Sequence, residues 1–107
     1  MNLISEDISN YAEHMSSEAP DYLNQLERAT NLRVPNGRMA SGFLQGRLLA
    51  TISKMLRPDL ILDIGTFSGY SALCLAEGLS DSGKLITLER NEELSVIQNE
   101  FFGKSPF

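Results

Sequence analysis

The sequence is poor in cysteine and histidine. The chain of 107 residues contains one cysteine, Cys74, and one histidine, His14. A single cysteine cannot form a disulfide within the chain, and one cysteine with one histidine is too few for a cluster of metal ligands. These absences predict a reducing, cytoplasmic setting. Cys74 lies between Leu73 and Leu75 in a helical stretch, so we expect a small buried packing residue rather than a reactive thiol.

Basic residues and long apolar runs are also scarce. The chain has 9 Lys and Arg residues against 14 Asp and Glu, for a net charge of −5, whereas non-specific binding to nucleic acids or anionic membranes needs clustered basic residues. No apolar run approaches the roughly 20 residues that span a bilayer, and no secretory signal pattern is visible at the N-terminus. We therefore expect neither a nucleic-acid partner nor a membrane. A hydrophobic fraction of 42% is enough for a folded domain.

Apolar residues recur at helical spacing in the first half of the chain. A first helix is predicted over Leu3–Met15, a second begins at Pro20, and a third is capped by Ser41 and ends before Pro58. The apolar stripe of the third helix comprises Leu44, Leu48, Ile52 and Met55. We therefore predict a helical segment over residues 1–57.

The pattern changes after residue 57. Leu60–Ile64 is a continuous apolar run with one acid, as in a parallel strand buried on both faces. A glycine-bracketed turn follows, then a helix over Tyr70–Leu79, a second strand over Lys84–Glu89 and a helix that Asn91 can cap. Strand, helix, strand and helix in this order predict an α/β fold, in which residues 58–107 form the opening βαβα unit of a doubly wound parallel sheet.

The turn between the first strand and its helix is the first candidate ligand-binding element. Gly65 permits a backbone bend that a side chain would obstruct, and Gly69 lets the helix begin close to a ligand. Free N–H groups at the start of that helix, together with the Ser71 hydroxyl, can hold a carboxylate. Because open α/β sheets bind ligands at the carboxyl ends of their strands, we expect the site there.

Two acids flank this turn. Asp63 lies inside the end of the first strand, where a carboxylate needs a partner; a ligand ammonium is favoured, and the backbone N–H groups of its own loop are the alternative. Glu89 ends the second strand, 24 residues after Gly65, and an acid about 20 residues after the glycines binds ribose in dinucleotide sites. The alternative for Glu89 is a solvated carboxylate paired with Arg90.

These elements together indicate a ligand that contains a nucleoside. Phe67 stands where a dinucleotide fingerprint has its second glycine, so the backbone cannot approach a pyrophosphate as closely. This disfavours NAD and FAD. It is compatible with a nucleoside that carries an amino-acid group in place of phosphates.

Three segments resemble the catechol and caffeoyl-CoA O-methyltransferases. They are residues 62–73 (LDIGTFSGYSAL), 85–89 (LITLE) and the upstream 38–49 (RMASGFLQGRLL). The resemblance runs from about residue 35 to the end of the chain and implies the N-terminal part of a Rossmann-like methyltransferase that uses S-adenosylmethionine to methylate a catechol-like or phenolic hydroxyl. Under it, residues 58–107 are the first half of the cofactor-binding domain.

The resemblance also implies roles for individual residues. The expected contacts to S-adenosylmethionine are Ser41, Asp63, Gly65, Thr66, Ser71 and Glu89, with Ser71 at the methionine carboxylate and Glu89 at the ribose. Asp63 stands where Glu is frequent in the family, which leaves room for a water molecule. The family also uses a divalent metal, typically Mg²⁺, held by Asp and Asn residues on later strands. The positions of those ligands and of the catalytic lysine lie beyond this chain, so we assign no catalytic or metal-binding residue.

Two functions follow as expectations. The chain is either a methyltransferase fragment that is inactive alone, or a non-catalytic oligomerising or interaction module derived from the same fold. With few strands, the sheet would leave bare edges that pair readily with another chain. We therefore expect a homo-oligomer that forms through exposed strand edges.

Overall fold

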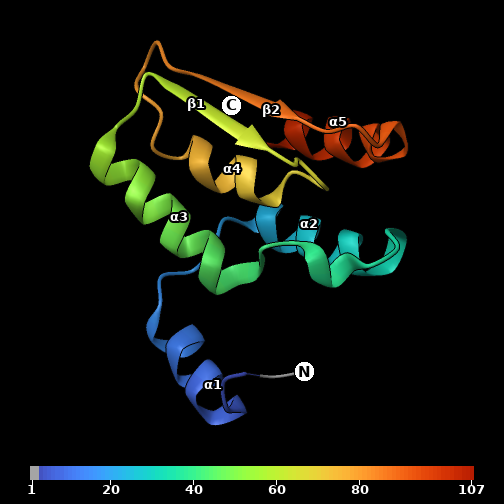
Figure 1. The fold of residues 1–107 in the computed structure, drawn as a ribbon. Coiled ribbons are helices and arrows are strands. Elements are labelled where there is room, and N and C mark those ends of the chain that lie inside the picture. Colours follow the sequence, from blue (N-terminus) through green and yellow to red (C-terminus); the bar gives the residue numbers. More distant parts are fainter. Residues whose placement is uncertain (1–2) are drawn as a thin grey trace.

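The computed structural model describes residues 3–107 and contains five α-helices, two short 3₁₀ helices and a two-stranded sheet over that range (Figure 1). In chain order the elements are α1 (Glu6–Met15), α2 (Asp21–Arg33), η1 (Gly37–Met39), α3 (Gly42–Leu56), β1 (Leu60–Ile64), α4 (Tyr70–Ala76), β2 (Lys84–Leu88), η2 (Glu92–Leu94) and α5 (Ser95–Lys104). This order confirms the predicted α/β class, with helices first and a βαβα unit after them.

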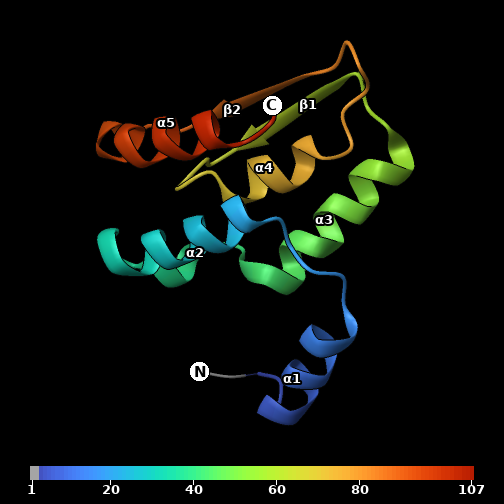
Figure 2. The same cartoon turned by 180° about the vertical axis from the view of Figure 1, so that it is seen from behind.

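The sheet is parallel and in simple register. Leu60 lies opposite Lys84 at one end, and Ile64 lies opposite Leu88 at the other. Helix α4 connects the two strands and packs beneath them, with α5 beside it (Figures 1 and 2). Since the strands run in the same direction, their carboxyl ends lie at the same edge of the sheet.

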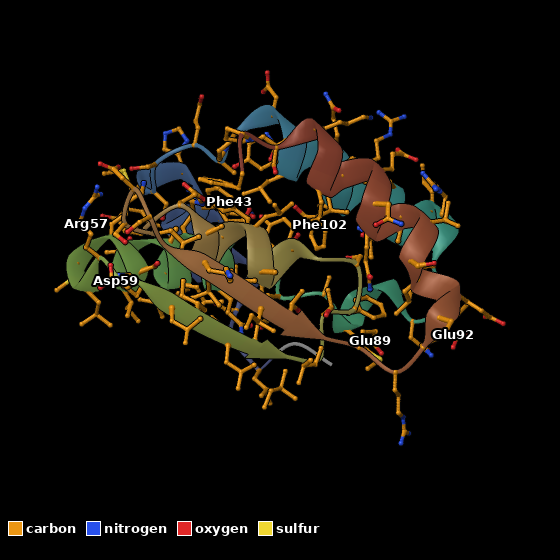
Figure 3. The ribbon with its side chains drawn as sticks, turned by 90° about the horizontal axis from the view of Figure 1, so that it is seen from above. Phe43, Arg57, Asp59, Glu89, Glu92 and Phe102 are labelled. Atoms are coloured by element: carbon orange, nitrogen blue, oxygen red, sulfur yellow. The ribbon has the colours of Figure 1, made fainter. Side chains whose placement is uncertain are left out.

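The prediction that β1 is buried on both faces was wrong. Leu60, Leu62 and Ile64 are exposed, while Ile61 and Asp63 between them are half-buried. In the part of the chain that the structure describes, helices cover one face of the sheet, and side chains stand free on the other (Figure 3). Ile86 and Leu88 of β2 extend this apolar face. A strand made of apolar residues is buried on both faces only where helices cover both faces of the sheet.

Helix α3 also buries a different face from the one its apolar stripe suggests. Leu48, Ile52 and Met55 of the stripe are exposed. The buried residues of α3 are small, namely Gly46, Ala50 and Ser53, and α3 packs closely against α4. Small side chains form this interface because they let the two helix backbones approach one another. The approach is close enough for the Ser53 hydroxyl to donate to the backbone carbonyl of Leu75 at 2.5 Å.

An ion pair with little exposure joins α3 to the end of α4. Arg47 donates to both carboxylate oxygens of Glu77, and the two side chains are 12% and 10% exposed. The hydrogen bond from Arg47 to Glu77 raises the pKa of the guanidinium further. Cys74 lies beside this pair, is fully buried as predicted, and has its thiol pKa raised to about 11 by burial. Such a thiol is protonated and inert at neutral pH.

Helix α1 projects from the rest of the molecule (Figures 1 and 2). The Ser5 hydroxyl caps it by accepting from the N–H of Ile8 at 3.4 Å. The apolar residues that predict this helix remain exposed, namely Ile4, Ile8, Tyr11 and Met15. The helix therefore begins three residues later than predicted, at Glu6, and ends at Met15 as predicted; among the described residues no surface covers its apolar face.

The close approach of the backbone to α3 makes a testable prediction at Gly78. A Cβ added there would lie 2.2 Å from the carbonyl carbon of Ser53 and 2.4 Å from the backbone nitrogen of Lys54. We expect Gly78→Ala to lower the free energy of unfolding by about 1–3 kcal/mol, because backbone atoms must move. The matched control is Gly103→Ala in α5, where nothing lies within 4 Å; it should raise stability by about 0.5–1 kcal/mol. Urea denaturation measures the two changes, and equal effects would contradict this packing.

Candidate functional site

The candidate site lies at the carboxyl ends of β1 and β2. The chain leaves β1 at Gly65, which has a φ of 89°, in the left-handed region that glycine adopts without strain. The N–H groups of Gly65 and Thr66 donate to the carbonyl of Leu88 at 2.8 and 3.1 Å, so the turn continues the ladder of the sheet. This anchors the loop of residues 65–69 to the end of β2.

Gly69 is required for a reason that the sequence did not reveal. Its φ is 101°, and a Cβ built on it would lie 2.6 Å from the ring of Phe102. Phe102 comes from α5 and its ring points inward among the helices (Figure 3). Gly69 therefore leaves room for the Phe102 ring of α5 beside the start of α4. This is in addition to its predicted role, which is to let α4 begin close to a ligand.

Asp63 takes part in a hydroxyl network. Thr87 donates to its carboxylate at 2.9 Å, and the Ser71 hydroxyl contacts the other oxygen at 3.5 Å. Thr66 and Thr87 oxygens are 2.5 Å apart. Because the one proton of Thr87 is directed at Asp63, Thr66 must be the donor to Thr87. The carboxylate is thus partnered by side chains rather than by the backbone of its own loop, which was the alternative to a ligand.

Glu89 directly follows β2 and is exposed at the sheet edge (Figure 3). One carboxylate oxygen accepts from the N–H of Phe67 at 2.9 Å, and the other accepts from the N–H of Asn91 at 3.1 Å. These two bonds lower the pKa of Glu89 below its ordinary value, and the bond from Phe67 has the larger effect. Among the ion pairs of the described residues, none joins Glu89 to Arg90. Each oxygen keeps acceptor capacity toward solvent.

Two further residues of the site escaped the sequence analysis. Thr87 lies two residues after Leu85 on β2, so the two side chains are on the same half-buried face of the sheet. The parallel register places Thr87 opposite Asp63, so this contact follows from the sequence once that register is assumed. Gln98 of α5 donates from its side-chain amide to the carbonyl of Phe67 at 2.7 Å. Nothing in the local sequence marks Gln98, because its partner lies 31 residues away in the chain.

Two adjoining cavities lie around the loop. The larger, about 630 Å³, is lined by polar groups that include Glu89, Arg90 and Asn91. The smaller, about 40 Å³, is lined by hydroxyl-bearing residues, namely Ser41, Thr66, Ser68, Tyr70 and Ser71. Met39, Gly65 and Phe67 border the two cavities alike. A separate cavity of about 620 Å³ beside β2 and the C-terminal residues carries none of the predicted site residues.

The structure brings the six predicted residues to one end of the sheet. Ser41, Gly65, Thr66 and Ser71 line the small cavity, Asp63 contacts Ser71, and Glu89 borders the large cavity. Ser41 occupies the position before α3 but makes no capping bond with its side chain, so the predicted side-chain cap was wrong. Their roles toward a ligand stay predictions.

Comparison with known proteins identifies the family. The O-methyltransferase family model matches residues 13–107. The chain belongs to the O-methyltransferase family. It is 38% identical over 66 residues to mouse (Mus musculus) catechol O-methyltransferase domain-containing protein 1, covering 62% of this chain and 25% of that protein. It is 32% identical to caffeoyl-CoA O-methyltransferase of Stellaria longipes over 68% of this chain and 30% of that protein.

Comparison with solved structures leads to the same family. An SAH-bound methyltransferase from Podospora anserina superposes with a TM-score of 0.85 at 32% identity, over 97% of this chain and 47% of that one. An O-methyltransferase from Bacillus cereus in complex with SAH gives 0.81 at 25% identity, over 92% of this chain and 44% of that one. This O-methyltransferase chain therefore has the Rossmann-like fold of its family and spans less than half the length of these relatives.

The residues present do not fit a metal centre. Within residues 3–107, no three His, Cys, Asp or Glu side chains gather closely enough to hold an ion. Nor does any helix in that range have the length and apolarity needed to cross a membrane.

The lowered pKa of Glu89 predicts a pH-dependent loop contact. A carboxyl whose folded pKa lies below its unfolded value stabilises the fold above the unfolded value, about 4.3 for Glu. That contribution is lost as the pH falls through the folded pKa. We expect the amide proton shifts of Phe67 and Asn91 to titrate together in NMR spectra, with a midpoint below about 4.3. Glu89→Gln should remove this titration and Glu92→Gln should leave it; a midpoint at the ordinary value would contradict the contacts.

Proposed function

We propose that this chain is the cofactor-binding portion of an O-methyltransferase and binds S-adenosylmethionine at the carboxyl ends of β1 and β2. The observation that carries the proposal is the placement of Glu89. Its exposed carboxylate borders a cavity of about 630 Å³, next to a small hydroxyl-lined cavity on the same loop. An acid at one end and hydroxyl and N–H donors at the other suit a nucleoside joined to an amino acid.

The chain offers partners for the ribose and for the amino-acid group of that cofactor. Glu89 has acceptor capacity for the ribose hydroxyls, since each exposed oxygen accepts one N–H from the described residues and can accept further donors. The buried hydroxyl of Ser68 has no hydrogen-bond partner among the described residues and lies in the wall of the small cavity, where a carboxylate would satisfy it. Ser71 and Ser41 line the same cavity, and Asp63 behind Ser71 supplies negative charge for an ammonium group.

The bound cofactor would supply an electrophilic methyl group for transfer to a hydroxyl. The chain's own residues bind and orient the cofactor, and we assign none of them to proton removal. We propose a catechol-like or phenolic acceptor, because relatives bear the names catechol and caffeoyl-CoA O-methyltransferase. We further propose that residues 1–107 alone do not catalyse methyl transfer. We propose a cytoplasmic location, and we propose the use of Mg²⁺ for the complete family domain.

Titration calorimetry with S-adenosylhomocysteine tests cofactor binding. We expect the chain to bind it and to ignore NAD, because Phe67 keeps the loop backbone from a pyrophosphate. Glu89→Ala should weaken binding about tenfold or more, since hydrogen bonds to a charged group contribute about 1.5–3 kcal/mol. The matched control is Glu92→Ala, a neighbouring exposed acid (Figure 3). Absence of binding, or equal effects of the two variants, would favour a non-catalytic interaction module instead.

We also propose that the chain self-associates through its free strand edges. Leu62 and Ile64 of β1 lie opposite Ile86 and Leu88 of β2 in the sheet, and all four side chains are exposed. Uncovered apolar strands promote pairing with another chain.

Light scattering tests the proposed association. We expect a molar mass at least twice the 11.8 kDa of one chain, and Leu62→Lys should reduce it because a charge at a strand edge opposes pairing. Ser82→Lys, on the exposed loop before β2, is the control. A stable monodisperse monomer of the unsubstituted chain would refute the association.

A further inference from the structure

The peptide groups around Phe67 are held from two sides by side chains distant in sequence. The N–H of Phe67 donates to Glu89 at 2.9 Å, and its carbonyl accepts from the amide of Gln98 at 2.7 Å. Glu89 comes from the end of β2 and Gln98 from α5. The loop between Gly65 and Gly69 is therefore fixed at its midpoint by two elements that follow it in the chain.

This loop needs such support because Phe67 has an unfavourable backbone conformation. Its φ is 49°, in the left-handed region, where a bulky residue is a genuine outlier. Residues in such conformations persist only when their surroundings over-determine them. The two side-chain bonds to Phe67 are the contacts in the structure that act directly on its strained backbone.

The amide group of Gln98 is suited to this task. A backbone carbonyl can only accept, so the nitrogen of the Gln98 amide must face Phe67. The side chain is partly buried, and its helix is anchored in the core by Ile97 and Phe101, which lie on one face of the helix. A donor on a fixed helix therefore meets the carbonyl of a strained loop without further ordering of either element.

We propose that Gln98 is a positioning residue of the cofactor site. By holding the Phe67 carbonyl, it keeps the Phe67 N–H aimed at Glu89 and thereby orients the Glu89 carboxylate for the ribose hydroxyls. The inference rests on the proposed binding of S-adenosylmethionine, but the contact it describes exists in the free chain and can be measured there.

The test compares three substitutions, with Gln98→Ala as a fourth if Gln98→Met does not fold. Gln98→Met keeps the length of the side chain and removes the donor, Gln98→Lys restores a donor, and Asn99→Ala is the control on the adjacent exposed residue. In the free chain, hydrogen exchange of the Phe67 amide should accelerate about fivefold or more in Gln98→Met, the factor that corresponds to losing one hydrogen bond. The amide of the buried Ala50 in α3 should exchange as before, which separates loop release from general destabilisation.

Affinity for S-adenosylhomocysteine gives the second readout. Gln98→Met should weaken binding about fivefold, Gln98→Lys should recover most of that loss, and Asn99→Ala should match the unsubstituted chain. Unchanged Phe67 exchange together with unchanged affinity in Gln98→Met would overturn the role of Gln98. If the unsubstituted chain does not bind the ligand, the proposed function fails, and Phe67 exchange still decides whether Gln98 holds the loop. If Gln98→Met does not fold, the Gln98→Lys and Gln98→Ala pair serves the same comparison.

Discussion

The parallel pairing of β1 with β2 is the constraint on which the site depends. A parallel pair needs a crossover connection, here through α4, and it brings the carboxyl ends of the strands to one edge. The ladder then continues past the strands, because Gly65 and Thr66 donate to the carbonyl of Leu88. Backbone hydrogen bonds thereby place Asp63, the loop and Glu89 together.

Among residues 3–107, helices support this edge from one side of the sheet. Helices α3 and α4 approach through small residues, the Arg47–Glu77 ion pair crosses their contact, and the core continues to α2 and α5. The opposite face of the sheet is apolar and exposed in the described residues. The chain superposes on 47% of the methyltransferase from Podospora anserina.

The polar groups at the sheet edge divide into two linked sets. Asp63 collects hydroxyl donors from Thr87 and Ser71, whereas Glu89 collects backbone donors from Phe67 and Asn91. Thr66 and Phe67 are neighbours in the loop, so the two sets are joined through its backbone. A change in the loop conformation therefore alters the surroundings of the acids at both strand ends, and the contact from α5 to Phe67 extends that coupling to the last helix.

The sequence alone determined the elements and the edge at which they meet. Periodicity located the helices, the apolar run and glycine bracket located β1 and its turn, and spacing located Glu89, because these signals arise from neighbours in the chain. Tertiary structure decided which faces are buried: small residues rather than the stripe of α3 form its interface, and one sheet face stays open. It also decided the partners of Asp63 and Phe67, since Thr87 and Gln98 lie 24 and 31 residues from them. Contacts at such separations leave no local pattern, because they exist only once the strands and helices have packed.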